Sequence, residues 1–321
     1  MVVGAPKLLE RFDKHTGRCL SPGYTGPGKG WATRSQELIY PLAVLWATQH
    51  KDNPYYQSEE LLEVIQKGGD ALMDVQHPDG RMDYIAADGS FYGLTYYCWP
   101  IYHWLETYVL IGEQLGEERR VRWARGLALA YDGIARQEMI LVNKGYRPIN
   151  TIVWQGMSLA RAGQVFGRED WSETGRNIVH YIISHQSEYG YWDEHGGPTT
   201  SYNLVYAHAL GLYYIFTGDE IALDSVRRAL DFHLMFTYPN GAHVETIDGR
   251  VPYRGILSRR GIPAFSLLPK GQRFNSWKFL LPIWGNQLSE CSTEMASIVQ
   301  YVRQGAEATI PQDLGSYELT M

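Results

Sequence analysis

The sequence has few cysteines: Cys19, Cys98 and Cys291 are the only three among its 321 residues. They lie far apart and form no CxxC pair, which argues against a structural zinc site or a disulfide framework. We therefore expect buried or incidental thiols. The loops discussed below also lack HxH and HExxH motifs, so we expect no bound metal and no required cofactor.

Long hydrophobic runs and an excess of basic charge are missing as well. The longest apolar stretches, residues 157–162 and 204–216, are interrupted by Arg161, His208 and glycines, so we expect no membrane partner. The formal net charge of −6 argues against general nucleic-acid binding, which requires a basic face.

A secretion signal is not visible at the start of the chain. The segment MVVGAPKLLERF carries Lys7, Glu10 and Arg11 where a signal peptide would need an apolar core. The compartment is therefore open: periplasmic or secreted if a leader has been removed, and cytoplasmic otherwise.

Aromatic residues, in contrast, are abundant. The chain is 45% hydrophobic and 20% charged, enough to bury a large core, and it contains 10 Trp and 23 Tyr. Most of these rings are expected in the core, because aromatic residues dominate cores generally. The remainder could stack on the faces of sugars.

The hydrophobic pattern predicts an all-α chain. Residues 1–34, rich in glycine and proline, are expected to form an irregular arm, residues 35–305 a helical domain, and residues 306–321 an extension that could link to a β-domain, with SYELTM as a strand fragment. Helices are predicted over residues 35–49, 58–75, 96–115, 117–139, 151–166, 171–185, 202–216, 220–236 and 288–304.

The helices recur as pairs. Their ends fall roughly fifty to sixty residues apart, the period of a two-helix repeat. Three long connections, HPDGRMDYIAADG, SEYGYWDEHGG and YPNGAHVETIDGR, each place a glycine before and after a short alternating run. We therefore predict an α/α toroid, an incomplete barrel of helical hairpins whose long loops meet at one mouth. A straight open solenoid of the same hairpins is the alternative.

The stretch from Tyr189 to Asp219 combines an acid pair, a histidine, a Gly-Gly-Pro turn and a tyrosine-rich helix start. The hydroxyls of Thr199, Thr200 and Ser201 are expected to cap a helix that begins near residue 202. His195 and Tyr202 would then lie at one rim, where loops held by a rigid scaffold commonly carry active sites.

The order of Asn150 and Trp154 in NTIVW, followed by Gly190, His195 and Tyr202 in GYWDEHGGPTTSY, resembles that of polysaccharide lyases with an α/α-toroid domain. About residues 35–260 are similar to chondroitin AC lyase-type and heparinase II/III-like enzymes. The resemblance implies β-elimination on a polysaccharide that contains uronic acid, giving an unsaturated uronyl end.

That reaction needs three kinds of group. An amide such as Asn150 can stabilise the enolate-like charge on the substrate carboxylate, as an oxyanion hole does. Tyr202 can remove the C5 proton and protonate the leaving oxygen, and His195 is an alternative base or an aid to neutralisation. The structural alternatives are a helix cap for Asn150, a solvated loop residue for His195 and wall packing for Tyr202.

Further residues are candidates for substrate binding. The segment from Arg250 to Arg273 carries six basic residues and no acidic one, so it could clamp carboxylates or sulfates, although charge runs usually form a solvated face. The candidates are Trp154, Trp192, His243, Arg250, Tyr253 and Arg254. The expected partner is an anionic polysaccharide or oligosaccharide, and the oligomeric state is open.

Two other functions stay open. A glycoside hydrolase on the same toroid would use two carboxylates, which Asp83, Asp88, Asp193, Glu194 and Glu245 could supply from the long loops. A non-catalytic glycan-binding toroid would use the aromatic mouth without cleaving its ligand.

Overall fold

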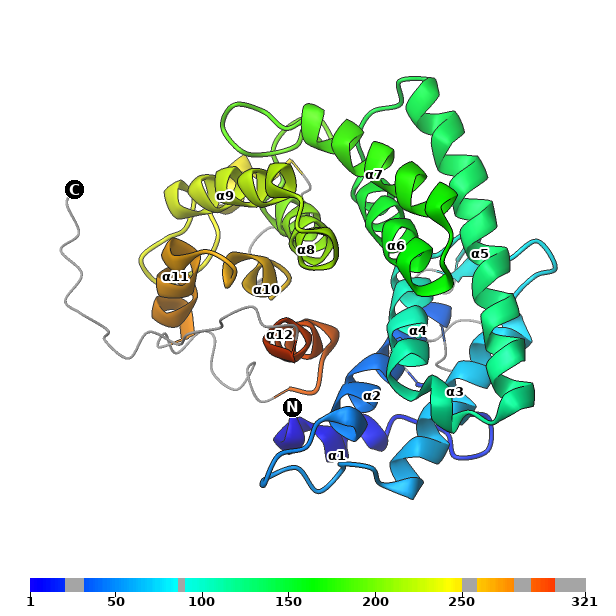
Figure 1. The fold of residues 1–321 in the computed structure, drawn as a ribbon. Helices are drawn as coiled ribbons and strands as arrows, with labels where there is room; N and C mark the ends of the chain where they lie inside the picture. The colour runs from blue at the N-terminus through cyan, green and yellow to red at the C-terminus, as the bar shows by residue number, and fades with distance from the viewer. Residues whose placement is uncertain (21–31, 86–89, 250–258, 280–289, 304–321) are drawn as a thin grey trace. The chain divides into compact units, whose positions relative to one another are not determined.

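The chain folds almost entirely into α-helices (Figure 1). A computed structural model describes residues 1–20, 32–85, 90–249, 259–279 and 290–303. Its α-helices are α1 (Ala5–Leu9), α2 (Ile39–Ala47), α3 (Glu59–Val75), α4 (Cys98–Ile111), α5 (Glu117–Asn143), α6 (Asn150–Phe166), α7 (Glu169–Ser184), α8 (Thr200–Thr217), α9 (Glu220–Met235), α10 (Gly261–Phe265), α11 (Pro269–Phe279) and α12 (Thr293–Arg303). Short 3₁₀ helices lie at Val2–Gly4, Thr33–Leu38, Gly112–Gln114 and Glu245–Ile247.

Two kinds of helix alternate along the chain. Helices α4 and α8 are buried on nearly all sides, because apolar residues occupy most of their turns. Helices α3 and α9 are amphipathic, with one buried stripe and acidic residues in the first turn, where the helix dipole favours negative charge. This alternation is that of a helical hairpin with one inner and one outer helix.

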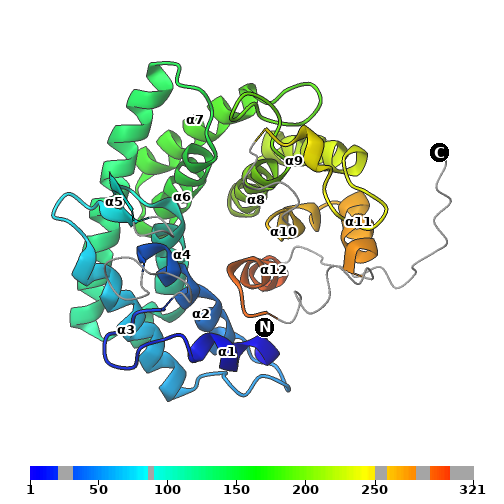
Figure 2. The same ribbon diagram turned by 180° about the vertical axis from the view of Figure 1, so that it is seen from behind.

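Consecutive helices pack as these hairpins (Figures 1 and 2). Helix α2 contacts α3, and α8 contacts α9. Glycines bring α6 and α7 together: a Cβ on Gly156 would lie 2.6 Å from Ile178, and one on Gly175 would lie 2.5 Å from the backbone of Ala160. Substitution of either glycine would force the two helices apart.

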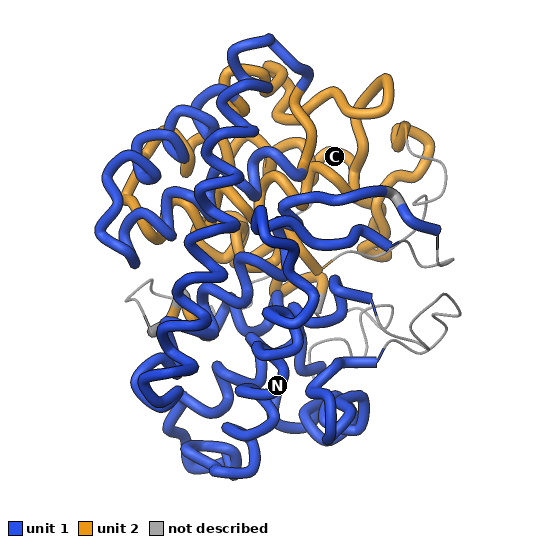
Figure 3. Tube along the Cα trace, turned by 90° about the vertical axis from the view of Figure 1, so that its right-hand side faces the viewer, with its two compact units in different colours: residues 1–147, 151–181, 289–299 blue, residues 148–150, 182–288, 300–321 orange. Residues whose placement is uncertain are grey.

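The structure divides into two compact units (Figure 3). The first comprises residues 1–147, 151–181 and 289–299, and the second residues 148–150, 182–288 and 300–321. Within the first unit a late helix packs against an early one: Ala296 of α12 is buried in a cluster with Tyr40 and Val44 of α2. The second unit contains α8, α9, α10 and α11, and α10 contacts both α8 and α9.

One predicted loop contains a small sheet. Strands β1 (Met82–Ile85) and β2 (Phe91–Thr95) pair antiparallel, with Met82 opposite Thr95. The segment QHPDGRMDYIAADGS was predicted as a long connection between two helices that contains a short alternating run. The alternation in MDYI and the β-branched and aromatic residues of FYGLT favour a half-buried hairpin instead.

The three similar loops share one turn, as their sequences predict. Gly80, Gly190 and Gly241 have φ values of 88°, 89° and 82°, a region that residues with a Cβ rarely adopt. In each loop the glycine N–H donates to the carbonyl three residues before it, at 2.8, 3.0 and 2.8 Å. A Cβ on Gly190 would also lie 2.0 Å from the Arg228 carbonyl oxygen, so this loop is pressed onto α9.

The shared turn fixes which side chains of each loop are buried. Two residues after the glycine stand Met82, Trp192 and His243, all at most 3% exposed. Four residues after it stand Tyr84, Glu194 and Glu245. The second position therefore anchors each loop in the core.

The structure confirms some of the other sequence predictions and corrects others. All three cysteines are free and buried, as expected. The predicted irregular arm contains α1, and α10 and α11 were not predicted. The proposed strand at 316–321 lies outside the described residues. No described helix combines the length and apolarity needed to cross a bilayer.

Candidate active site

Glu194 lies at the centre of a hydrogen-bonded cluster in the second unit. Its Oε1 accepts from the side-chain amide of Asn150 at 2.8 Å, and its Oε2 accepts from the Asn150 backbone N–H at 3.2 Å. The hydroxyl of Tyr206 donates to the same Oε2 at 2.8 Å. Glu194 is 7% exposed, so this carboxylate receives three donors away from bulk water.

Asn150 is the first residue of α6, whereas the sequence pattern predicted that it would precede and cap the helix. Glu194 takes the capping role instead, because a carboxylate is stabilised at the positive end of the helix dipole. The contact also fixes the side chain: Glu194 binds one of the two amide hydrogens of Asn150. The second hydrogen remains for another acceptor.

The two acids of the cluster have shifted pKa values. Burial raises the pKa of Glu194, and the hydrogen bonds from Tyr206 and Asn150 oppose that shift. Burial also raises the pKa of Tyr206, and the neighbouring charge of Glu194 raises it further. Tyr206 therefore stays protonated and acts as a donor, so its phenol is unsuited to removing a proton.

Tyr206 is held in place by a second aromatic ring. Trp192 stacks on it with ring centroids 4.6 Å apart and planes at 7°. The Trp192 indole N–H donates to the Ile182 carbonyl at 2.8 Å. Both rings are buried, so the stack holds the Tyr206 hydroxyl in place as a donor to Glu194.

His195 and Tyr202 form the accessible side of the cluster. The His195 side chain is 41% exposed, and its Nε2 lies 3.8 Å from Glu194 Oε1. Its ring lies 5.5 Å from the half-buried ring of Tyr202, centroid to centroid. His195 has a φ of 61°, one of only two positive values among described residues that are not glycine. Such a backbone is costly for most residues and is concentrated at functional sites.

The start of α8, which carries Tyr202 and Tyr206, is capped from a distant loop. Thr199 occupies the cap position without a side-chain hydrogen bond, contrary to the predicted use of local hydroxyls. Asp248 Oδ2 instead accepts from the Thr200 hydroxyl at 2.8 Å and from the Ser201 N–H at 3.4 Å. The buried Asp248 thereby fixes the first turn of the helix.

The same two loops are joined through their backbones. The Gly249 N–H donates to the Pro198 carbonyl at 2.9 Å, and within the earlier loop the Glu194 N–H donates to the Gly197 carbonyl at 3.1 Å. A Cβ on Gly249 would lie 3.4 Å from the His195 carbonyl oxygen, so the two loops are in van der Waals contact there. The loop that carries His195 is therefore braced by the next similar loop along the chain.

Of the other residues predicted to bind substrate, Trp192 supports the cluster by stacking on Tyr206. Trp192 and His243 are buried at the anchoring position of their loops. Trp154 is buried in the first unit against Trp99, Tyr102 and His103. Contact of these three side chains with a sugar stays a prediction. Arg250, Tyr253 and Arg254 lie outside the described residues.

The carboxylates that a hydrolase would need have different surroundings. Asp193 is exposed, Asp83 lies 2.9 Å from His77, and Glu194 is bound by Asn150 and Tyr206. Glu245 is half-buried, and Asp88 is outside the described part of the chain. Both oxygens of Glu194 accept hydrogen bonds from side-chain or backbone donors of the cluster.

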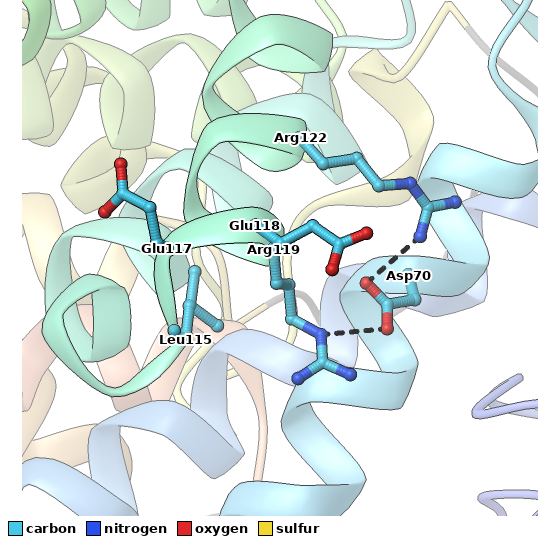
Figure 4. A pocket seen from close by; sticks show the side chains of 7 residues that line it. Asp70, Leu115, Glu117, Glu118, Arg119 and Arg122 are labelled. Atoms are coloured by element: carbon cyan, nitrogen blue, oxygen red, sulfur yellow. Dashed lines mark hydrogen bonds and ion pairs between the residues drawn. The ribbon is translucent and has the colours of Figure 1, made fainter.

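A surface pocket of about 400 Å³ lies elsewhere, between α3 and the start of α5 in the first unit (Figure 4). Its arginines are paired internally: Arg119 Nε lies 3.0 Å and Arg122 Nη1 lies 3.6 Å from the Asp70 carboxylate. It contains none of the residues predicted to act on a substrate. We therefore place the candidate active site at the Glu194 cluster.

Three members of the cluster were missed or assigned differently from the sequence. Glu194 was considered only as a hydrolase acid, and Tyr206 and Asp248 were not considered. Tyr206 lies one helical turn after Tyr202, a spacing that places two residues on the same helix face and could have identified it. Asp248 gave no comparable signal, because its contact with Thr200 spans 48 residues.

Comparison with solved structures supports the fold. A mutant chondroitin AC lyase from Streptomyces coelicolor A3 is 16% identical with a TM-score of 0.59, over 97% of this chain and 45% of that chain. An unsaturated glucuronyl hydrolase specific for heparin is 10% identical with a TM-score of 0.55, over 94% of this chain and 81% of that chain. The chain thus spans about half the length of the chondroitin lyase. The predicted α/α-toroid fold is confirmed.

Comparison of sequences gives the family. No curated protein sequence matches the chain. Residues 27–247, which include the whole Glu194 cluster except Asp248, match the family described as the ulvan lyase N-terminal domain. The match covers more than half of the chain, and the resemblance to toroid polysaccharide lyases is confirmed. The chain belongs to the ulvan lyase N-terminal domain family.

Proposed function

We propose that the protein is a polysaccharide lyase that cleaves a uronic-acid-containing anionic polysaccharide by β-elimination. The observation that carries the proposal is the Glu194 cluster, in which an oriented asparagine amide accompanies an accessible histidine and tyrosine. The family match and the likeness to a chondroitin lyase support it.

In this reaction Asn150 acts on the substrate carboxylate. One amide hydrogen is bound by Glu194, and the other donates to the carboxylate and stabilises the enolate-like charge that develops when the C5 proton leaves. Because Glu194 fixes the amide before substrate binds, little reorganisation is needed in the transition state. Glu194 is thus a positioning residue.

Tyr202 and His195 move the proton. One of them removes the C5 proton, and Tyr202 then protonates the glycosidic oxygen that leaves C4. The C5 electron pair forms the C4–C5 double bond as the C4–O bond breaks, so no water is consumed. The exposed imidazole of His195 is accessible to substrate. Either assignment of the base fits the 5.5 Å separation of the two rings.

Ulvan, an anionic polysaccharide that contains uronic acid, is the substrate we expect first, because the family takes its name from ulvan lyase. The test is a product screen over ulvan, glucuronan, alginate, pectic, heparin and chondroitin substrates. A lyase creates an unsaturated uronyl end that absorbs ultraviolet light. New reducing ends without that absorbance would contradict the proposal.

A hydrolase is the second candidate, favoured by one observation. Glu194 is a buried carboxyl group with a raised pKa, the property of a general acid, and one structural neighbour is an unsaturated glucuronyl hydrolase. The lyase ranks first because three donors already occupy Glu194.

Tyr202→Phe distinguishes an enzyme from a binding module: an enzyme loses turnover but keeps its ligand, whereas a binding module loses little.

A further inference from the structure

Three basic side chains are buried together in the second unit, and none of them belongs to the Glu194 cluster. His233 lies on α9, His243 in the loop that follows α9, and Lys278 near the end of α11. None of the three is more than 3% exposed. The two imidazole rings lie 5.2 Å apart, centroid to centroid, with their planes at 65°. We call these three residues the base cluster.

The surroundings of the base cluster are aromatic. The His233 ring lies 5.4 Å from Phe232 and 5.6 Å from Phe265, centroid to centroid. The Lys278 Nζ lies 4.7 Å from the centroid of the Phe274 ring. The ring nitrogens of both histidines are buried and have no hydrogen-bond partner among the described residues. Protonation of either ring would therefore place a charge in an apolar site that offers no acceptor there, which is costly.

The acidic residues of the neighbouring elements have other partners. Asp231 of α9 pairs with Lys270 of α11 at 2.6 Å, Asp248 caps α8, and Glu245 is hydrogen-bonded to Tyr238. Helix α10 has no ionisable side chain. Among the described residues, the charges that act on the two histidines come from the base cluster itself. The other acidic or basic side chains on α8, α9 and α11 are those of His208, Glu220, Asp224, Arg227, Arg228 and Arg273.

Burial is the main cause of the shifted pKa values in the base cluster. It lowers the pKa of His243 from 6.5 to about 3 and that of Lys278 from 10.5 to about 7, and it lowers the pKa of His233 as well. The charge of Lys278 lowers the pKa of both histidines further. The unfolded chain thus binds more protons than the folded chain, so stability falls as the pH falls from 6.5 toward 3. Lys278 acts in the same direction between pH 10.5 and about 7.

The internal repeat shows that a loop of this kind does not need a titratable anchor. His243 stands two residues after the loop glycine, where the two earlier loops have Met82 and Trp192. Neither of those side chains changes its charge with pH. The loop anchored by histidine also supplies Asp248, which fixes the first turn of α8. A charge at this anchor therefore bears on the helix start beside the candidate active site.

From this geometry we infer that the base cluster is an acid-sensitive latch, which holds the loop at residues 237–249 in place only while both histidines are neutral. Opening of the loop exposes the imidazoles, which then take up protons, so acid favours the open loop. Asp248 leaves the start of α8 as the loop opens, and the first turn of that helix loosens. The latch acts on the fold, so the inference goes beyond the proposed reaction and does not depend on it.

The first test measures stability against pH. His243→Met places the anchor of the first loop in the third, His233→Met removes the other imidazole, and His185→Met is the matched control at an exposed histidine of the same unit. With a pKa of 6.5 unfolded and about 3 folded, His243 alone should raise the unfolding equilibrium constant about 25-fold between pH 7 and pH 5. Urea unfolding at the two pH values should show a smaller rise in His243→Met and in His233→Met. His185→Met should follow the wild type.

The second test distinguishes release of the loop from unfolding of the whole chain. Hydrogen exchange is read by mass spectrometry at pH 5, with every protein compared at that same pH. Residues 199–206 should exchange faster in the wild type and in His185→Met than in His243→Met, whereas residues 59–75 of α3 should exchange alike in all of them.

Equal dependence of unfolding on pH in the wild type and both cluster variants would overturn the latch. A reduced dependence accompanied by equal exchange at residues 199–206 would also overturn it, because the histidines would then affect global stability alone. Neither measurement uses a substrate, so failure of the latch and failure of the lyase proposal are distinguishable.

Discussion

At the scale of single residues, Glu194 decides whether the Asn150 amide is oriented. In Glu194→Gln one acceptor oxygen becomes an NH₂ group, which faces either the Asn150 side-chain amide or both the Asn150 backbone N–H and the Tyr206 hydroxyl. We expect kcat to fall about 10- to 100-fold, because an oriented transition-state donor is displaced. Steady-state kinetics on the best substrate measure this.

Glu188→Gln is the control for that experiment, since it makes the same change at an exposed carboxylate in the same loop. Its kinetics should match those of the wild type. Full activity in Glu194→Gln would show that Asn150 does not need this carboxylate.

His195 combines a rare backbone conformation with an exposed imidazole, and the two contributions can be separated. Asparagine tolerates a positive φ better than alanine does. The free energy of unfolding should therefore be unchanged in His195→Asn and about 1 kcal/mol lower in His195→Ala. Both variants should lose at least about 100-fold in kcat, because the proton-transfer or charge-neutralising group is gone. An active His195→Asn would assign the histidine to loop geometry rather than chemistry.

Glu138 is buried on α5, and one of its carboxylate oxygens has no hydrogen-bond partner among the described residues. Burial raises its pKa to about 7 from 4.5. The folded protein therefore keeps a proton that the unfolded chain loses between these pH values, so stability falls as pH rises from 4.5 to about 7 and is constant above.

The corresponding stability change is about 3 kcal/mol at most. Glu138→Gln removes this term, so its thermal midpoint should exceed that of the wild type by an amount that grows between pH 5 and pH 7. Parallel midpoint curves for the two proteins would show that Glu138 is not buried in its charged form.

At the scale of elements, the start of α8 is fixed by Asp248. Asp248→Ala removes the acceptor for the Thr200 hydroxyl and the Ser201 N–H, which should cost about 1–2 kcal/mol. Because Tyr202 follows in the same turn, kcat/KM should fall as well. Thermal unfolding and kinetics on one preparation give both quantities.

Asp219→Ala provides the comparison, because Asp219 caps α9 by accepting from the Ile221 N–H at 3.0 Å. It should cost about 1 kcal/mol and leave kcat/KM unchanged. If both variants reduce stability alike and neither alters kcat/KM, Asp248 has no part in holding the site.

Helix positions were predictable because local signals agree with the tertiary fold. Ser58 caps α3 by accepting from the Leu61 N–H at 3.2 Å, as its sequence pattern indicates. Helices α7, α8 and α9 begin within two residues of their predicted starts. The β1–β2 hairpin was missed because each strand is only four or five residues long.

The residues of the site were predictable only in part. The sequence indicated Asn150, His195 and Tyr202 by their order, but the contact between Asn150 and Glu194 spans 44 residues. Spacing along the chain carries no information about such a contact. Alignment of the three similar loops could have indicated that Trp192 and His243 anchor their loops, since Met82 occupies their place in the first loop.

At the scale of the whole molecule, the repeat shows how one loop architecture presents different side chains. Each similar loop uses the same glycine turn and the same buried anchor position. The residue four after the glycine changes from Tyr84 to Glu194 to Glu245, and with it the side chains that the loop can hold. The second unit thereby holds an oriented amide beside His195 and Tyr202.

Cleavage in water enriched in ¹⁸O tests the central claim most directly. β-Elimination breaks the C4–O bond without adding water, so the masses of the two products should sum to that of the substrate. No ¹⁸O should enter either product, and one product should absorb ultraviolet light. A gain of one labelled oxygen per cleavage, without that absorbance, would show hydrolysis and contradict the account.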